Sequence, residues 1–271
     1  MIELPETYVL SEQINQTLID KTIQNVWADT HPHKFAWYSG DPAAYNSMLS
    51  GMKINGTGIG VSCGTIVEIL CEDMLLSISN PIKYHEPGEK LPKTHQLLVQ
   101  FTDDSHISSS VQMWGSMLCI PISERPADNN IPSPLTDDFD ENYFDNLINS
   151  VKPAITVKAL LATEQRIPGL GNGVLHDILF NAGMHPKRKI MTLSDADKEK
   201  LFKSVKYTLK EMKELGGRDT EKDLFNNKGG YNTILSKNTL AYPCRNCGSG
   251  LIRQAFLGGN IYFCPSCQPL N

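Results

Sequence analysis

Four cysteines close to the C-terminus are the residues whose type and spacing most specifically indicate chemistry. They form two CxxC pairs separated by 16 residues: Cys244, Cys247, Cys264 and Cys267. Each CxxC turn brings two thiolates to one point, and two such turns supply the four ligands of a tetrahedral zinc ion. Four protein ligands leave no open coordination position, so the pattern predicts a zinc ribbon with one structural zinc ion per chain.

A glycine turn is the second candidate site. The run Gly169-Leu170-Gly171-Asn172 lies between two segments of helical periodicity. The second helix therefore begins with free backbone N–H groups, which can bind an anion. The amide of Asn172 can add a donor, and Lys158 can add a positive charge. An ordinary turn between two helices fits the same residues, so the motif alone leaves both interpretations open.

Charge is divided unequally along the chain. The formal net charge is −5, but residues 1–150 carry 7 basic and 20 acidic side chains, whereas residues 151–271 carry 18 and 10. This asymmetry predicts two units with different electrostatic roles, the second facing a polyanion. A row of lysines at helical spacing either meets phosphate or forms the solvated face of a helix. The row consists of Lys203, Lys206, Lys210 and Lys213.

Composition excludes several classes of protein. A hydrophobic content of 40% with 8% aromatic residues indicates packed cores rather than a disordered chain. No apolar run approaches the ~18 residues of a membrane span. The first six residues contain two acids where a signal peptide has bases. The odd number of cysteines, 7, argues against a disulfide framework and suits a reducing compartment. We therefore expect a cytoplasmic, nucleoid-associated location.

The first half has the pattern of a strand domain that opens with one helix. Helical spacing runs over Thr7–Ile19. Short runs rich in branched residues follow at Thr65–Leu70, Met74–Ser79, Gln96–Phe101 and His106–Gln112. Polar connections within each successive pair indicate hairpins, and this strand spacing predicts an antiparallel sandwich or barrel. We expect this domain to span residues 1–125, with a polar, Pro-rich linker at 126–138.

After the linker the hydrophobic period becomes helical. The four predicted helices are Phe139–Ser150, Ile155–Gln165, Asn172–Ala182 and Ala196–Leu215. Ser194 is the expected N-cap of the last helix, and Gly216-Gly217 is its stop signal. Residues 218–242 are polar and contain glycine, which predicts a mobile loop. The expected domains are a helical domain over 139–240 and a zinc finger over 241–271.

The order of these parts resembles the formamidopyrimidine-DNA glycosylase and endonuclease VIII family of base-excision repair proteins. Glu3-Leu4-Pro5-Glu6 is similar to the family's N-terminal signature, Ile155–Arg188 to its helix–two-turn–helix motif, and Pro243–Gln268 to its zinc finger. The resemblance covers nearly the whole chain. It implies an α+β fold: an N-terminal antiparallel β-sandwich flanked by a helix, and a C-terminal helical helix–two-turn–helix domain with a β-hairpin zinc finger.

The resemblance also implies an activity. Members of this family flip a damaged base out of the DNA stack and cut its glycosidic bond. The amine of an N-terminal proline usually attacks the sugar, an adjacent glutamate handles protons, and strand cleavage follows. On this resemblance Glu3 and Glu6 match the glutamates of the catalytic signature. Lys158 and Asn172 match residues that hold DNA phosphates. The implied partner is damaged duplex DNA, bound by a monomer.

Several positions depart from the family pattern. Ile2 stands where the family has proline, so the free amine is expected on Met1, one residue away from the usual nucleophile. The wedge loop, usually Arg-Arg-Phe-Gly, has the sequence Gln112-Met113-Trp114-Gly115. Trp114 can still stack into the gap left by a flipped base. Two further basic residues of the family align with glycines: Gly64 on a strand, and Gly258 or Gly259 at the zinc-finger hairpin tip.

Three functions remain compatible with these departures. In the favoured one, Glu3 activates water, and the protein is a glycosylase with weak or no AP-lyase activity. In the second, Met1 replaces the proline and both activities remain. In the third, the protein binds damaged or distorted DNA without catalysis, and Glu3 and Glu6 are helix N-terminal acids favoured by the helix dipole. An RNA-binding or regulatory zinc-ribbon protein on the same scaffold is a more remote alternative.

Overall fold

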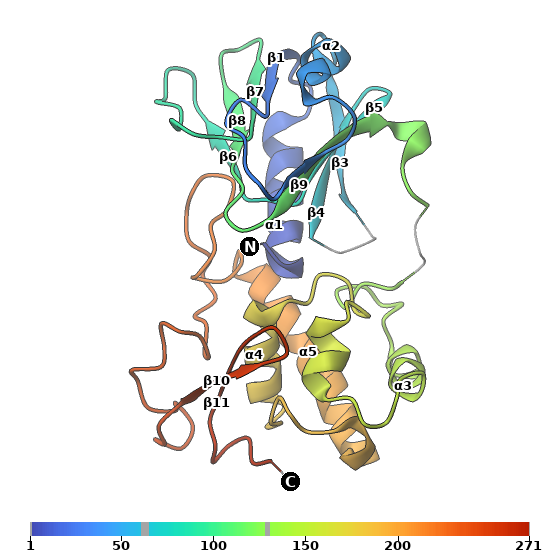
Figure 1. The fold of residues 1–271 in the computed structure, drawn as a ribbon, viewed down its shortest axis with the longest axis vertical. Helices are drawn as coiled ribbons and strands as arrows, with labels where there is room; N and C mark the ends of the chain where they lie inside the picture. The colour runs from blue at the N-terminus through green and yellow to red at the C-terminus, as the bar shows by residue number, and fades with distance from the viewer. Residues whose placement is uncertain (1, 61–64, 128–130, 271) are drawn as a thin grey trace. The chain divides into compact units, whose positions relative to one another are not determined.

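Residues 2–60, 65–127 and 131–270 are described by a computed structural model, in which the chain divides into two units (Figure 1). The N-terminal unit combines most of the first half of the chain with Gly216–Gly230, and the C-terminal unit contains the remainder. Among the described helices, none has the length and apolar character that crossing a bilayer requires.

The N-terminal unit consists of two β-sheets and the long helix α1 (Leu4–Leu18), with a short helix α2 (Tyr45–Leu49). One sheet has the strand order β1-β7-β8-β6 and is antiparallel. Its strands are β1 (Ile23–Ala28), β6 (Ile82–His85), β7 (Leu97–Phe101) and β8 (His106–Ser109). The other sheet has the order β2-β9-β5-β4-β3 and is antiparallel except for the parallel pair β2–β9. Its strands are β2 (Ala36–Tyr38), β3 (Ile54–Gly60), β4 (Ile66–Cys71), β5 (Met74–Ile78) and β9 (Gly115–Pro121).

The predicted antiparallel sandwich is confirmed. The four runs of branched residues form β4, β5, β7 and β8, which pair as the two predicted hairpins. Five strands were not predicted, and β3 shows why: its seven residues include Gly56, Gly58 and Gly60. Glycine has low strand propensity, so tertiary pairing rather than local preference makes this segment a strand.

A continuous apolar core positions α1 within the sandwich. Leu10, Ile14 and Leu18 of α1 are fully buried together with Val67 of one sheet and Val99 of the other. Full burial of each such side chain contributes about 1.5–3 kcal/mol. This packing fixes the axis of α1, and therefore the place at which its N-terminal acids lie.

The C-terminal unit contains three α-helices, α3 (Glu141–Asn149), α4 (Asn172–Asn181) and α5 (Asp195–Glu214). These confirm three of the four predicted helices. The Oγ of Ser194 accepts a hydrogen bond from the backbone N–H of Asp197 at 3.2 Å, which confirms Ser194 as the N-cap of α5. Gly216 and Gly217 adopt positive φ angles of 77° and 96°, as glycines that terminate helices do.

The helix predicted over Ile155–Gln165 is shorter than expected: residues 157–163 are helical, with a π-helical turn over Ala159–Thr163. The residues before it pair with another segment instead. The backbone N–H of Val157 donates to the carbonyl of Arg188 at 2.9 Å, and that of Ile190 donates to the carbonyl of Ile155 at 2.9 Å. These bridges use the backbone groups that would otherwise begin the helix.

The prediction of a mobile loop over residues 218–242 is also wrong where the segment is buried. Arg218 and Leu224 are buried in the N-terminal unit, and Leu235 is buried in the C-terminal unit. The two carboxylate oxygens of Asp177 accept hydrogen bonds from the backbone N–H groups of Ile234 and Leu235 at 2.8 and 2.9 Å. Long-range contacts therefore anchor a segment that has little secondary structure of its own.

Candidate active site and nucleic-acid interface

The two signature glutamates lie at the start of α1. Glu3 is the N-cap, and its backbone N–H donates to Oε2 of Glu6 at 3.0 Å. Pro5 occupies the first turn, where its missing N–H costs no helical hydrogen bond. The signature Glu3-Leu4-Pro5-Glu6 therefore encodes a capping box that begins the helix at a fixed residue.

A buried arginine joins these two acids. Arg218 donates from Nε to Oε1 of Glu6 and from Nη2 to Oε2, both at 2.8 Å, and its backbone N–H donates to Oε1 at 3.1 Å. Its Nη1 lies 3.6 Å from Oε2 of Glu3. Glu3 is 5% exposed, Glu6 3% and Arg218 2%. We call these three residues the acid cluster. Sequence reasoning missed Arg218, because it lies 212 positions from Glu6.

The pKa values of Glu6 and of the neighbouring Glu221 shift in opposite directions. Burial alone would raise the pKa of Glu6, but the charge and hydrogen bonds of Arg218 outweigh it and hold that pKa below its usual value. Nearby, burial raises the pKa of Glu221. Carboxyl groups with oppositely shifted pKa values in one buried place are typical of functional sites.

Residues 1 and 2 are the positions at which the family's nucleophile is expected. Ile2 is fully buried, at 0% exposure, and belongs to the apolar core of the N-terminal unit. The residue in the proline position is therefore a core side chain. Met1, predicted as an alternative nucleophile, lies outside the described residues, as does Gly64.

The predicted wedge loop joins β8 to β9. Gln112, Met113 and Trp114 are all exposed there, with Met113 68% and Trp114 46% accessible to solvent. Gly115 follows directly, and a Cβ at this position would lie only 1.5 Å from Oδ1 of Asn80. Only glycine fits at this close approach, so the end of the loop is fixed while its tip projects into solvent.

The two predicted phosphate-holding residues lie beside the zinc-finger hairpin, formed by β10 (Ile252–Phe256) and β11 (Gly259–Phe263). Nζ of Lys158 donates to the carbonyl of Phe256 at 2.6 Å. A Cβ on Gly259 would lie 2.7 Å from Nδ2 of Asn172, which is the first residue of α4. The glycine turn, Lys158 and the hairpin tip, predicted separately, are thus brought together within one unit.

Lys158 is buried, and the hairpin tip beside it is a tight turn. Burial lowers the pKa of Lys158, whose side chain passes through the interior of the unit. At the hairpin tip Leu257 and Gly258 adopt positive φ angles of 47° and 72°, the backbone of a two-residue primed turn. The tip residues carry no side-chain cation of their own, but the ammonium groups of Lys158 and Lys187 lie 5.9 and 5.1 Å from the ring centroid of Phe256, at the end of β10.

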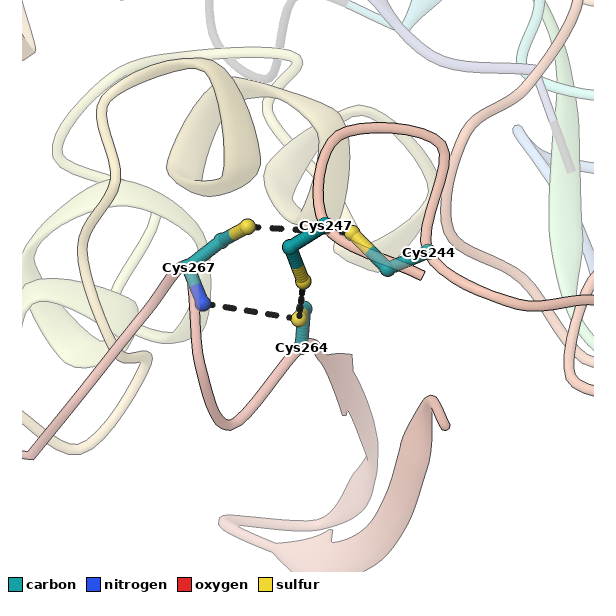
Figure 2. A group of neighbouring side chains, drawn as sticks. All are labelled: Cys244, Cys247, Cys264 and Cys267. Carbon is teal, nitrogen blue, oxygen red and sulfur yellow. Dashed lines mark hydrogen bonds between the residues drawn. The ribbon is translucent and has the colours of Figure 1, made fainter. Parts of the chain in front are cut away.

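The four predicted cysteines converge on one point (Figure 2). Their Sγ atoms all lie within 4.8 Å of one another, with 3.7 Å between Cys244 and Cys267 and 3.4 Å between Cys247 and Cys264. Zinc–sulfur bonds of about 2.3 Å in tetrahedral geometry place sulfurs about 3.8 Å apart. The cysteine cluster therefore fits a metal ion with four thiolate ligands.

The lysine row on α5 is largely occupied by partners within the same unit. Lys203 pairs with Glu199 and Lys210 with Glu214, each one helical turn away. Nζ of Lys206 donates to the carbonyl of Thr136 at 2.6 Å. These contacts favour the interpretation of the row as a solvated helix face.

Comparison with known proteins agrees with this arrangement. A family model described as the formamidopyrimidine-DNA glycosylase H2TH domain matches residues 131–223. A formamidopyrimidine-DNA glycosylase of Oceanobacillus iheyensis is 26% identical over 285 residues, covering 99% of this chain and 98% of the relative. That of Bacillus licheniformis is 27% identical over 282 residues, covering 99% of each.

Solved structures show the same fold. The Lactococcus lactis Fpg in complex with DNA containing N7-benzyl-Fapy-dG superposes with a TM-score of 0.84 at 22% identity, over 98% of this chain and 99% of that one. The MutM (Fpg) protein of Thermus thermophilus superposes with a TM-score of 0.79 at 20% identity, over 99% of each. The helical part of the chain therefore matches the H2TH domain of formamidopyrimidine-DNA glycosylase, and the whole chain is similar to proteins of that name.

Proposed function

We propose that this protein is a base-excision DNA glycosylase that releases a damaged base from duplex DNA with weak or no AP-lyase activity. The observation that carries the proposal is the acid cluster at the start of α1, combined with a buried Ile2 in the nucleophile position. Relatives along the whole chain are named glycosylases, and several structural neighbours are complexes with DNA containing a damaged or abasic site.

Glu3 is the group that handles protons in this proposal. Both carboxylate oxygens of Glu6 are already bound by Arg218 and by the backbone of Glu3, so Glu6 positions the start of the helix. Glu3 makes a longer contact with Arg218, at 3.6 Å. Its carboxylate accepts a proton from water as the water oxygen bonds to C1′ of the sugar. The bond from C1′ to the base nitrogen breaks, and the base departs with that electron pair.

Position 2 supports the loss of lyase activity. Strand cleavage in this family follows an imine formed by an N-terminal amine, and the nitrogen of Ile2 is an amide with no basic lone pair. Its side chain fills the core, so the residue cannot turn toward a substrate without exposing apolar surface. Base release by water requires no amine and is unaffected by this change.

DNA is held mainly by the C-terminal unit. Lys158 and Asn172 bind backbone phosphate, and Trp114 fills the gap left by the flipped base. The cysteine cluster holds one structural zinc ion, which fixes the hairpin against which Lys158 lies. The ion takes no part in the reaction, because its four ligands are protein thiolates.

One assay separates base release from strand cleavage. A duplex oligonucleotide containing Fapy-dG is incubated with the protein and analysed with and without alkali. We expect strand breaks only after alkali and no adduct on borohydride treatment of an abasic duplex. Base release should disappear in Glu3→Gln and persist in Glu12→Gln, an exposed change on the same helix. Unchanged release by Glu3→Gln would reject its role, and a borohydride adduct would show that an amine still acts.

A further inference from the structure

An exposed aromatic patch extends beyond the wedge loop. It consists of four side chains that we call the aromatic platform: Phe35, Trp37, Met113 and Trp114. Their exposed fractions are 45%, 51%, 68% and 46%. Two of the four come from the wedge loop, and the other two come from β2 and the residue before it. Large apolar side chains that gather on a surface mark a place of interaction.

Strand pairing brings the two halves of the platform together. β2 and β9 run parallel, with Ala36 opposite Gly115 and Trp37 opposite Ser116. The backbone N–H of Gly115 donates to the carbonyl of Phe35 at 2.9 Å. The rings of Trp37 and Trp114 meet edge to face, with centroids 6.3 Å apart and planes at 65°. Trp37 therefore supports the indole of Trp114 and still leaves half of its own surface in water.

The fold does not require Trp37 to be aromatic. Side chains alternate along β2, and the inward neighbour Tyr38 already contacts Tyr45, with ring centroids 6.2 Å apart. Trp37 points to the opposite side and adds little to the core. Its exposed ring is therefore free to contact a partner.

Charge indicates what that partner is. The first 150 residues carry a net charge of −13, so the platform lies in the half of the chain that repels a phosphate backbone. Aromatic rings bind the uncharged faces of nucleobases and do so with any sequence. Within the platform's own segment the ammonium of Lys34 lies 5.2 Å from the ring centroid of Phe35, which adds one local positive charge.

We infer that the aromatic platform is a stacking site for two unpaired nucleobases, and that Trp37 is a DNA-binding residue in addition to the wedge tryptophan. The inference rests on the proposed function and names its substrate class: lesions flanked by bases that are already unpaired. A second ring becomes useful when a second base is free to leave the helix. In a fully paired duplex that base pair must first be opened, which costs free energy.

The test compares two DNA probes of the same length. One is a duplex with a stable abasic analogue, and the other has mismatched pairs flanking the analogue so that neighbouring bases are unpaired. Dissociation constants are measured by fluorescence anisotropy for the full-length wild type, W37L, W37F and W27L. Trp27 is the matched control, because it is 39% exposed and lies on β1 of the other sheet.

We expect the wild type to bind the unpaired probe more tightly. W37L should lose about tenfold or more of its affinity for that probe, with a smaller loss on the paired duplex. W37F should retain most of the preference, since it keeps a ring, and W27L should behave as the wild type. An unchanged preference in W37L would overturn the inference and leave the proposed function standing.

Two further outcomes are decisive. If the wild type binds neither probe, the proposed function fails and the inference fails with it. If W37L instead abolishes self-association seen by sedimentation while DNA binding is unchanged, the platform is a protein–protein contact and the inference is rejected.

Discussion

The acid cluster and the cysteine cluster are both groups of like-charged ligands held close together, but their counter-charge comes from different sources. At the start of α1, two carboxylates share the guanidinium of Arg218, which is part of the same chain. Near the C-terminus, four cysteine sulfurs converge on one point and fit a metal ion from solution. The cysteine cluster should therefore respond to removal of the metal ion, and the acid cluster to substitution of Arg218.

Metal removal should have the largest effect and should act on one region alone. A strong chelator is expected to release one zinc ion per chain and to unfold the hairpin, because binding of structural zinc contributes on the order of 10 kcal/mol. DNA binding should be lost, while the apolar core of the N-terminal unit remains folded. Metal analysis, anisotropy and hydrogen exchange of α1 check these outcomes. Full DNA binding by metal-free protein would contradict the proposed role.

Removing the internal counter-charge is expected to have the next largest effect. Arg218→Met leaves Glu3 and Glu6 buried without a cation, which should destabilise the N-terminal unit by about 3–5 kcal/mol. Urea unfolding measures the loss. Lys53→Met is the control, because it breaks the exposed pair with Asp20 and should cost about 0–1 kcal/mol. Equal losses in the two variants would show that burial of the acid cluster has no special cost.

The acid cluster should also give a distinctive dependence on pH. The pKa of Glu6 is lowered by folding from 4.5, so its stabilisation is present above that value and is lost as the pH falls through the lowered folded-state pKa. The pKa of Glu221 is raised by folding from 4.5, so its contribution is present below that value and is lost as the pH rises through the raised folded-state pKa. The two carboxyl groups therefore give slopes of opposite sign.

Unfolding free energies measured from acid to neutral pH distinguish the two groups. Glu6→Gln should remove the part of the decline that occurs on acidification, and Glu221→Gln should remove the part that occurs on approach to neutral pH. A pH-independent offset in both variants would show that neither group couples to folding.

The smallest expected change is in the affinity for DNA and its dependence on salt. Lys158→Gln should weaken binding to all sequences alike and reduce the slope of log affinity against log salt by about 1, the loss of one phosphate contact. Lys203→Gln, on the paired face of α5, should leave the slope unchanged. Anisotropy titrations at several salt concentrations provide the measurement. The same slope in both variants would place Lys158 outside the interface.

The parts that were predictable from sequence are those whose information is local. The cysteine ligands are fixed by spacing within 24 residues, and Ser194 and Gly216 mark the ends of α5 by their intrinsic conformational preferences. The glycine turn indicated Lys158 and Asn172 as anion-binding candidates, and the resemblance added Glu3. All of these lie where a local pattern or a motif indicates them, although their roles in binding and catalysis remain predictions.

The parts that were not predictable depend on distant residues. Arg218 has no motif, and only the folded chain shows that it meets Glu6. Trp37 belongs to the three-residue strand β2, whose parallel pairing with β9 carries no local signal. The helix expected from residue 155 is shortened because its backbone pairs with residues 188–190. In each case a tertiary contact outweighs local propensity.

The membership of Gly216–Gly230 in the N-terminal unit has a consequence for biosynthesis. The first 129 residues leave the ribosome early, but the guanidinium of Arg218, which pairs with Glu6 and Glu3, and Leu224, which fills the same core, come about 90 residues or more later. Domains usually fold in the order in which they are made. Here the unit that begins first must wait until α5 and the segment after it have been translated before its buried carboxylates gain their cation.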